Sequence, residues 1–263
     1  MNKHSPYHSI HNILSRYIVQ PFRFFLQERN DVFGLFNYYW LLINIKNTDT
    51  WKRLKIKLLK YHDITSADPG DALKYSEIDF WLGINIMRFL ELNLWKQKNL
   101  KILDIGCGPG FFCFICKMLG HEAIGMDRPL EYFNDSERII YTVIPEILNV
   151  EIIRRKITEY ESIILQDKFD LVTAFMVCFN KHKEIGEWGK AEWISFINDI
   201  FNYINPKGKL IMNLNANPEK YSELLYYDSN TLVMFDELGT ITRPGMVIIR
   251  EDKFGNAKGL KLC

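Results

Sequence analysis

The chain has 263 residues, of which 48% are hydrophobic and 25% charged, and its formal net charge is +1 at pH 7. This length and apolar content can bury a substantial core in one domain with an appendage. The balanced charge gives no general reason to expect nucleic acid as a partner. The five cysteines are odd in number in a long chain, which argues against a disulfide framework. Residues 1–9 are polar and no cleavable apolar run follows them, so we expect a cytoplasmic protein.

Residues 1–98 are predicted to form a helical extension or lid. The apolar segment 17–26 is interrupted by Pro21, and the segment 32–43 is aromatic and apolar almost throughout. The second segment is shorter than the ~20 apolar residues that span a bilayer. We expect it to form part of a lid or a dimer contact, which makes a homodimer plausible.

The segment 51–60 is basic and amphipathic, since five Lys or Arg residues alternate with aliphatic ones. Such a segment can rest on an anionic membrane surface or on an acidic partner. The favoured interpretation is a solvated helix whose apolar side packs on the core, so peripheral membrane contact is the less expected outcome. A turn at 68–71 follows, and 78–94 has helical spacing.

Residues 101–110, Lys-Ile-Leu-Asp-Ile-Gly-Cys-Gly-Pro-Gly, are the most informative part of the chain. An apolar strand pattern is followed by Gly106, Gly108 and Gly110, and then by a helical pattern over 111–119. Glycine tolerates positive φ and lets the backbone approach a ligand closely. The first N–H groups of the following helix can then bind an anion or a carboxylate. The pattern therefore predicts a cofactor-binding loop.

A second strand is predicted over 121–127, and it ends in Asp127. This acid follows Asp104 at close to the ~20-residue offset at which a carboxylate binds ribose hydroxyls in dinucleotide folds. The C-x-x-C formed by Cys113 and Cys116 lies in a strongly apolar helical pattern, so we interpret both as core thiols.

Further strands alternate with helical segments, which favours βαβ units and a mostly parallel sheet. A helix is expected over 194–203 and a turn over 205–209. The expected strands are 148–153, 168–175, 210–214 and 247–250.

The glycine spacing is G-x-G-x-G with an Asp two residues before it, whereas the dinucleotide fingerprint is G-x-G-x-x-G. This variant resembles motif I of the class I S-adenosylmethionine-dependent methyltransferases, and the resemblance covers residues 99–250. It implies an α/β, Rossmann-like fold with a mostly parallel seven-stranded sheet flanked by helices. The methyltransferase domain would then occupy residues 99–263, with S-adenosylmethionine as the cofactor.

The resemblance also implies which residues meet the cofactor. In the family, the turn after the third strand often has an acid followed by an apolar residue that covers the adenine. Here basic residues at 154–156 replace the acid, and Ile157 is the candidate adenine contact. Tyr75 and Arg88 are candidates to meet the cofactor carboxylate from the extension. The expected cofactor-binding set is Asp104, Gly106, Cys107, Gly108, Gly110, Asp127, Arg128, Ile157 and Phe175.

Acceptor-binding residues are expected after strands one, four and five, because ligands of open α/β sheets lie outside the carboxyl ends of the strands. His182 can take a hydroxyl proton near neutral pH and is the candidate general base, with an exposed loop histidine as the alternative. The candidate substrate residues are Tyr75, Asn180, Trp188 or Trp193, Asn213, Asn215 and Asn217. The three asparagines after strand five are alternatively turn residues around Pro218.

The N-P-P-[YF] tetrapeptide of amino-directed nucleic-acid methyltransferases is absent after strand four. The segment 174–182 resembles bacterial methyltransferases of surface-glycan, or polysaccharide, biosynthesis. This implies O-methylation of a small polar acceptor such as a sugar or a capsule precursor, with no nucleic acid and no metal. The alternatives are methylation of a phosphoryl or phosphoramidate oxygen, a non-catalytic S-adenosylmethionine-binding subunit, and an NAD-dependent dehydrogenase.

Overall fold

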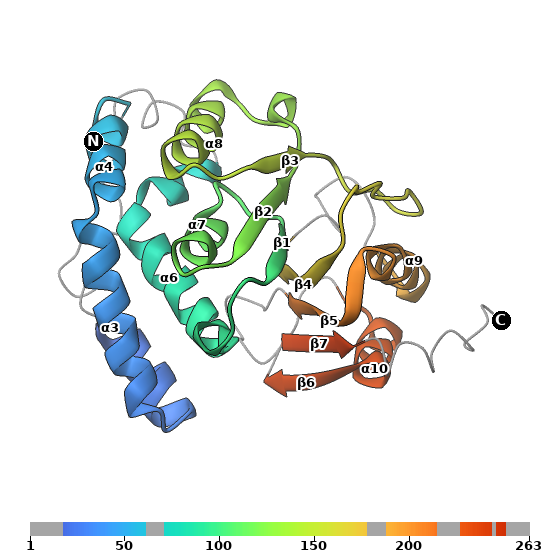
Figure 1. Cartoon of the computed structure of the whole chain (residues 1–263). Helices are drawn as coiled ribbons and strands as arrows, with labels where there is room; N and C mark the ends of the chain where they lie inside the picture. The colour runs from blue at the N-terminus through green and yellow to red at the C-terminus, as the bar shows by residue number, and fades with distance from the viewer. Residues whose placement is uncertain (1–17, 62–70, 178–187, 215–226, 244–245, 251–263) are drawn as a thin grey trace, which may run out of the picture. The chain divides into compact units, whose positions relative to one another are not determined.

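The computed structural model describes residues 18–61, 71–177, 188–214, 227–243 and 246–250 (Figure 1). The chain divides into two compact units. The helical unit comprises Met1–Lys98, Pro109–Leu119 and Phe133–Asn149. The sheet unit comprises Asn99–Gly108, Gly120–Tyr132 and Val150–Cys263.

The sheet unit contains a seven-stranded sheet with the strand order β3-β2-β1-β4-β5-β7-β6. Strands β1 to β5 pair in parallel, whereas β7 is antiparallel to both β5 and β6. This confirms the expected Rossmann-like, mostly parallel sheet. The strands are β1 Lys101–Ile105, β2 Glu122–Asp127, β3 Ile152–Arg154, β4 Phe169–Phe175, β5 Ile204–Asn213, β6 Gly239–Arg243 and β7 Met246–Arg250.

The third strand begins later than the sequence predicts. Residues up to Leu148 belong to α8, Asp135–Leu148, which begins at a capping box formed by Asn134 and Glu137. The helix ends at Asn149, which has a left-handed backbone (φ 52°) that asparagine tolerates better than most residues. The apolar residues of 148–150 therefore end a helix and lead into a loop, and only 152–154 form the strand.

Two helices of the sheet unit, α9 Lys190–Phe201 and α10 Ser229–Leu238, contact the strands β5, β6 and β7 (Figure 1). Their apolar side chains share one buried cluster with the inner residues of β1, β4, β5 and β7. Trp193 lies at its centre, with ring contacts to Trp188 at 5.2 Å and Phe235 at 5.3 Å. A short 3-10 helix, Leu130–Tyr132, follows β2.

The helical unit has a core of aromatic side chains. Trp51 is fully buried and its ring lies 6.2 Å from Phe114 and 6.0 Å from Phe111. Cys113 and Cys116 are fully buried on the same helix as Phe111 and Phe114, which confirms their interpretation as core residues. Its elements are α2 Gln20–Phe22, η3 Arg23–Glu28, α3 Val32–Asn47, α4 Asp49–Leu59, η4 Asp71–Ser76, α6 Ile78–Glu91, η5 Leu94–Lys96, α7 Phe111–Met118 and α8.

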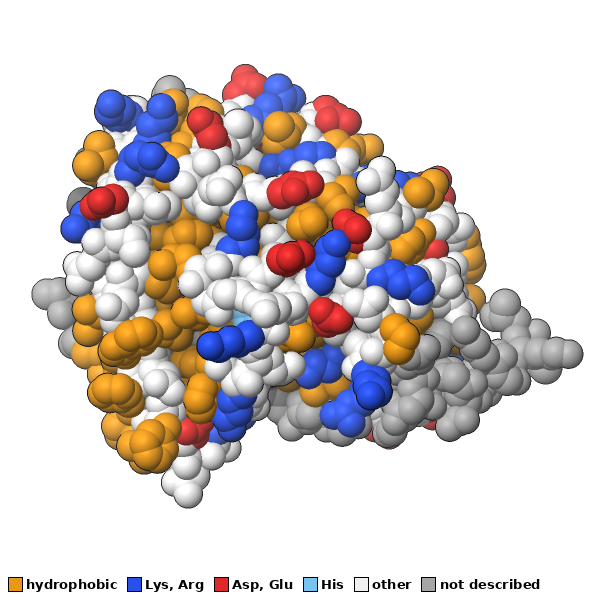
Figure 2. Space-filling model, viewed as in Figure 1, with side chains coloured by type: hydrophobic (Ala, Val, Ile, Leu, Met, Phe, Trp, Pro, Cys, Tyr) orange, Lys and Arg blue, Asp and Glu red, His pale blue; other side chains and the backbone are white. Residues whose placement is uncertain are grey.

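The helices α3 and α4 carry unusual surfaces. Figure 2 shows hydrophobic side chains gathered over α3 and Lys and Arg side chains over α4. None of the helices in the described ranges is both long and apolar enough to span a membrane.

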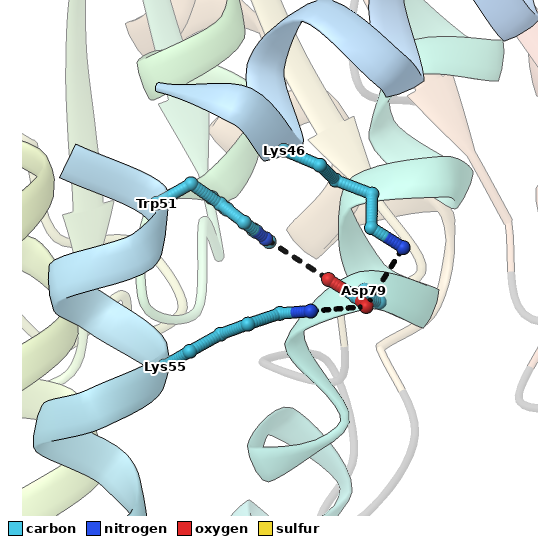
Figure 3. A network of polar contacts seen from close by, with 4 residues as sticks. All are labelled: Lys46, Trp51, Lys55 and Asp79. Carbon is cyan, nitrogen blue, oxygen red and sulfur yellow. Dashed lines mark hydrogen bonds and ion pairs between the residues drawn. The ribbon is translucent and has the colours of Figure 1, made fainter. Parts of the chain in front are cut away.

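Asp79 of α6 joins three helices of this unit (Figure 3). Its carboxylate accepts hydrogen bonds from Trp51 Nε1 at 2.9 Å and from Lys55 Nζ at 2.8 Å, both on α4. Lys46 Nζ of α3 lies 2.9 Å from the same carboxylate. Burial alone would raise the pKa of Asp79, but its bonds to Lys55, Lys46 and Trp51 hold that pKa below its ordinary value. We call this group the Asp79 bracket.

Candidate functional site

The glycine turn after β1 is fixed by its backbone. Gly106 and Gly108 have φ of +66° and +58°, a region that other residues rarely adopt. The N–H groups of Gly106 and Cys107 both donate to the carbonyl of Met126 in β2, at 2.8 and 3.1 Å. A Cβ on Gly106 would lie 2.0 Å from Val177 Cγ1, directly after β4. Glycine is therefore required here both for backbone conformation and for space.

Cys107 points its sulfur toward β2. Gly125 leaves room for it, because a Cβ on Gly125 would lie 2.4 Å from Cys107 Sγ. Burial raises the pKa of the Cys107 thiol well above its ordinary value, and the charges of Asp127 and Asp104 raise it further. The thiol therefore stays protonated and acts as packing for the turn, since only the thiolate is a strong nucleophile.

Asp127 closes the turn from the end of β2. One carboxylate oxygen accepts from Gly108 N at 2.7 Å, and the other accepts from Arg128 N at 2.8 Å. Burial raises the pKa of Asp127, although these two N–H groups and the charges of Arg154 and Arg128 oppose the rise. The side chain is half-buried, so a ligand can still reach it.

Arg154 is the last residue of β3 and pairs in register with Asp127. Its positive charge lowers the pKa values of both Asp127 and Cys107. The neighbouring Arg155 donates its N–H to the carbonyl of Asp127 at 2.8 Å and its guanidinium to Ser162 O at 2.9 Å. The basic residues that stand where the family often has an acid are thus part of the surroundings of Asp127.

Asp104 lies beneath the turn and is only 3% exposed. It accepts a hydrogen bond from Thr173 Oγ1 of β4 at 2.7 Å, and the two residues are register neighbours across the β1–β4 pair. This buried bond links the two strands whose carboxyl ends carry the glycine turn and the acceptor-side segment.

The ends of β4 and β5 lie at the same edge of the sheet. Phe175 pairs with Asn213, and the N–H of Met176 donates to the carbonyl of Asn213 at 2.7 Å. Met176 has a left-handed backbone (φ 52°), which turns the chain sharply after the strand. Phe175 is buried and Asn213 half-buried, so the expected acceptor side of the site has one described polar residue.

The remaining predicted site residues that the structure describes lie in cores, at a helix end, or beside other side chains. Ile157 is 8% exposed and belongs to the sheet-unit core cluster, as does Trp188. Gly110 (φ +86°) is the N-cap of α7. In the helical unit, Tyr75 packs against Trp81 and Tyr141, and Arg88 donates to Asn85 at 3.0 Å. Four of the candidates, Asn180, His182, Asn215 and Asn217, lie outside the described residues.

Three residues that shape the site were not predicted from the sequence: Gly125, Arg154 as a neighbour of Asp127, and Thr173. A lone threonine in the apolar strand 169–175 is only a weak indication of a buried hydrogen bond, since threonine is also common in ordinary strands. Its role emerges only when β1 and β4 are placed side by side.

The residues present fit an adenosine-containing cofactor. A carboxylate has about four lone-pair positions, and Asp127 uses two of them for Gly108 and Arg128. The two remaining lone-pair positions of this half-buried carboxylate can accept hydrogen bonds from two vicinal hydroxyls, such as those of a ribose. The positive-φ turn beside it allows a ligand close to the backbone. Among the described residues, no cluster of His, Cys, Asp or Glu could hold a metal ion.

Residues 96–244 match a protein-family model described as a methyltransferase domain. No curated protein is similar enough in sequence to be counted as a relative.

Solved structures that match part of the chain include the glycopeptide N-methyltransferase MtfA, with 14% identity, a TM-score of 0.34, and coverage of 50% of this chain and 53% of that one. Another is CalS10 from Micromonospora echinaspora, an amino pentose methyltransferase of calicheamicin biosynthesis, with 15% identity, a TM-score of 0.39, and coverage of 60% and 58%. DesVI of Streptomyces venezuelae has 14% identity, a TM-score of 0.36, and coverage of 61% and 58%. The chain spans about half the length of the first of these structures.

Proposed function

The chain belongs to the methyltransferase-domain family, whose class I members use S-adenosylmethionine, and we propose that it O-methylates a small polar acceptor such as a sugar or a glycan precursor. The observation that best supports methyl transfer from this cofactor concerns the surroundings of Asp127. Its carboxylate is held by Gly108 and Arg128 with acceptor capacity left over, directly beside a positive-φ glycine turn. That combination suits the ribose and the methionine ends of one ligand.

S-Adenosylmethionine supplies an electrophilic methyl group on a sulfonium. The chain has to bind this cofactor, align an acceptor oxygen in line with the methyl group, and exclude water. In our proposal Asp127 holds the ribose hydroxyls, and Ile157 and Phe175 supply apolar contacts for the adenine. The backbone of Gly106–Gly108 then approaches the methionine part.

The acceptor side of the proposal is built from the residues after β4 and β5. Asn213 presents an amide at the end of β5 beside Met176, which suits a hydroxyl-rich acceptor. We propose that Asn180 and Asn215 contribute further amides and that His182 accepts the hydroxyl proton. Trp188, Trp193 and Tyr75 are less suited to contact an acceptor directly, because they pack against other aromatic side chains.

The test has two stages. Calorimetry with S-adenosylmethionine should give binding that Asp127→Asn weakens, and NADH should give none. Release of S-adenosylhomocysteine should then be measured with sugar nucleotides and with glycan precursors from cell extracts. Cofactor binding without turnover on any acceptor would favour a non-catalytic subunit, and binding of NADH in its place would overturn the methyltransferase proposal.

His182→Ala separates two kinds of acceptor oxygen. A sugar hydroxyl must lose a proton during transfer, so we expect turnover to fall by about 100-fold or more, in line with typical general-base contributions. A phosphoryl or phosphoramidate oxygen is already nucleophilic and needs no base. Near-normal turnover of His182→Ala would therefore remove the general-base role and favour the phosphorylated acceptor.

A further inference from the structure

One face of α3 exposes large apolar side chains in helical register. Phe33, Phe36, Trp40 and Ile43 recur at intervals of three and four residues, which places them along one side of the helix. All four are exposed, from 80% for Phe33 to 53% for Trp40. A stripe of this kind is uncommon on a protein surface that faces only water.

The opposite face of the same helix already forms part of a core. Its buried residues are Gly34, Tyr38, Leu41, Leu42 and Ile45. The helix is therefore apolar on both sides, and packing within the helical unit accounts for only one of them. A helix that is apolar all round is usually buried on all sides.

The next helix, α4, adds positive charge to the same region (Figure 2). Its exposed face carries Lys52, Arg53, Lys57 and, at its end, Lys60. Between these cations Ile56 and Leu59 are exposed by 61% and 73%. The favoured interpretation, in which the apolar side of this segment packs on the core, is therefore correct for Trp51 and Leu54 and wrong for Ile56 and Leu59.

Acidic residues are nearly missing from the two helices. The sixteen residues of α3 include none, and α4 has only Asp49 in its first turn. A solvated helix face normally mixes both signs of charge. Within the described ranges, no carboxylate forms an ion pair with Lys52, Lys57 or Lys60.

The Asp79 bracket fixes the two helices against each other. It uses Lys46 and Lys55, and these two cations therefore have a partner inside the protein. Because α3 and α4 are both held by Asp79, the apolar stripe and the remaining cations keep a fixed position relative to each other. We define the docking surface as Phe33, Phe36, Trp40, Ile43, Lys52, Ile56, Lys57, Leu59 and Lys60.

We propose that this docking surface binds an anionic lipid membrane, with α3 and α4 lying along the surface. Exposed aromatic side chains next to Lys and Arg suit the boundary between headgroups and acyl chains, where apolar contact and charge attraction act together. A second copy of the chain, packed through the same two helices, would cover the apolar stripe but would give the cations no counter-charge, because these helices carry only one acidic residue. An anionic membrane satisfies both features. The proposal does not depend on the methyl acceptor.

The test is co-sedimentation of the full chain with vesicles. We expect binding to vesicles of phosphatidylcholine mixed with phosphatidylglycerol, little binding to phosphatidylcholine alone, and release at high salt. Phe36→Ser with Trp40→Ser, and separately Lys52→Glu with Lys57→Glu, should each lower the bound fraction by roughly tenfold. All four residues are exposed, so folding should be retained, which circular dichroism checks.

A matched control pair lies on the sheet unit. Ile164 is 71% exposed and Lys168 is also exposed, so Ile164→Ser with Lys168→Glu removes one exposed apolar side chain and reverses one exposed charge on the other unit. Its bound fraction should equal that of the wild type. The proposal is overturned if the wild type does not sediment with anionic vesicles, or if it binds phosphatidylcholine alone equally well. It is also overturned if light scattering shows a dimer that Phe36→Ser with Trp40→Ser splits while vesicle binding is absent.

Discussion

The two units each contain one aspartate at the centre of a polar group, and the two aspartates differ in how completely they are satisfied. Asp79 in the helical unit receives three side-chain donors, two of them cations, and its pKa lies below the ordinary value. Asp127 in the sheet unit receives two backbone N–H groups, and burial raises its pKa. The carboxylate of Asp79 has its hydrogen-bond and charge partners within the protein, whereas the carboxylate of Asp127 retains acceptor capacity for a ligand.

The difference shows how burial can serve structure in one place and binding in another. A partly buried carboxylate with cationic partners stabilises the helices that supply them. A partly buried carboxylate with only backbone donors is held in position without being neutralised. In our proposal, Asp127 therefore costs the free protein some stability and accepts further hydrogen bonds when the cofactor binds.

The largest effect should come from breaking the turn that brings the Gly108 N–H to Asp127. Gly106→Ala adds a Cβ that lies 2.0 Å from Val177 Cγ1 in a left-handed conformation. We expect the free energy of unfolding to fall by about 3 kcal/mol, from backbone strain and overpacking together. Cofactor binding should be lost, as urea unfolding and calorimetry would show.

Gly120→Ala is the matched control, because Gly120 also has positive φ (+92°) but no atom lies within 4 Å of its added Cβ. It should cost about 1 kcal/mol from the backbone alone and leave cofactor binding intact. Adding Val177→Ala to Gly106→Ala should recover part of the loss. If the two glycine variants behaved alike, contact with Val177 would not matter.

Exchanging each carboxylate for an amide should affect different properties in the two units. Asp127→Asn loses charge-assisted hydrogen bonds to the ribose, so cofactor affinity should fall by roughly 10- to 100-fold. It also leaves one of the two backbone N–H groups without an acceptor, so we expect the free energy of unfolding to fall by about 1 kcal/mol or less. Asp79→Asn should lower the free energy of unfolding by about 1 to 2 kcal/mol and leave cofactor affinity unchanged. Calorimetry and thermal unfolding on both variants measure this, and a loss of both properties in both variants would contradict the comparison.

Lowering the pH should change the contributions of the two aspartates to the free energy of unfolding in opposite directions. The pKa of Asp79 is lower in the folded than in the unfolded chain, so its contribution is present above the unfolded value, about 4, and is lost as pH falls through the folded pKa. The pKa of Asp127 is raised, so its cost to the free protein disappears in acid. Below about pH 4, the stability difference between wild type and Asp79→Asn should therefore shrink. The difference between wild type and Asp127→Asn should shift in favour of the wild type at higher pH, as the pH falls through the raised folded pKa of Asp127 toward the unfolded value of about 4. Urea unfolding from neutral pH into acid measures both.

The smallest effect should come from Arg154. Its charge lowers the pKa of Asp127, so Arg154→Met should raise that pKa further. The acid limit of cofactor binding should then shift to higher pH by less than about one unit, with little change at neutral pH. Arg155→Met is the control, since the Arg155 guanidinium bonds to Ser162 O. Equal shifts in both variants would mean that the charge of Arg154 has no special effect on Asp127.

The sequence predicted the central strands and the glycine turn because both depend on local patterns. Buried parallel strands are short apolar runs, and the left-handed turn requires glycine. The third strand was misplaced because the apolar residues near 148 satisfy a helix as well as a strand, and Pro145 lies within that helix. The helix α10 and the strand β6 were not predicted at all.

Features that depend on contacts between distant elements could not be predicted. The sequence of 51–60 predicted a helix whose apolar side packs on the core, but only the packing of the helical unit determines that Leu54 is buried and Ile56 exposed. The bond between Asp104 and Thr173 likewise requires the order in which strands join the sheet.

The close approach of Val177 to Gly106 also has a consequence for how donor and acceptor affect each other's binding. Val177 leads into the segment that contains Asn180 and His182, and Gly106 opens the turn proposed to receive the methyl donor. An acceptor that shifts Val177 would change the space at Gly106 and with it the affinity for the donor. Linkage then requires that the donor change the affinity for the acceptor by the same factor. Donor and acceptor would bind as a thermodynamically coupled pair, transmitted through one valine methyl group.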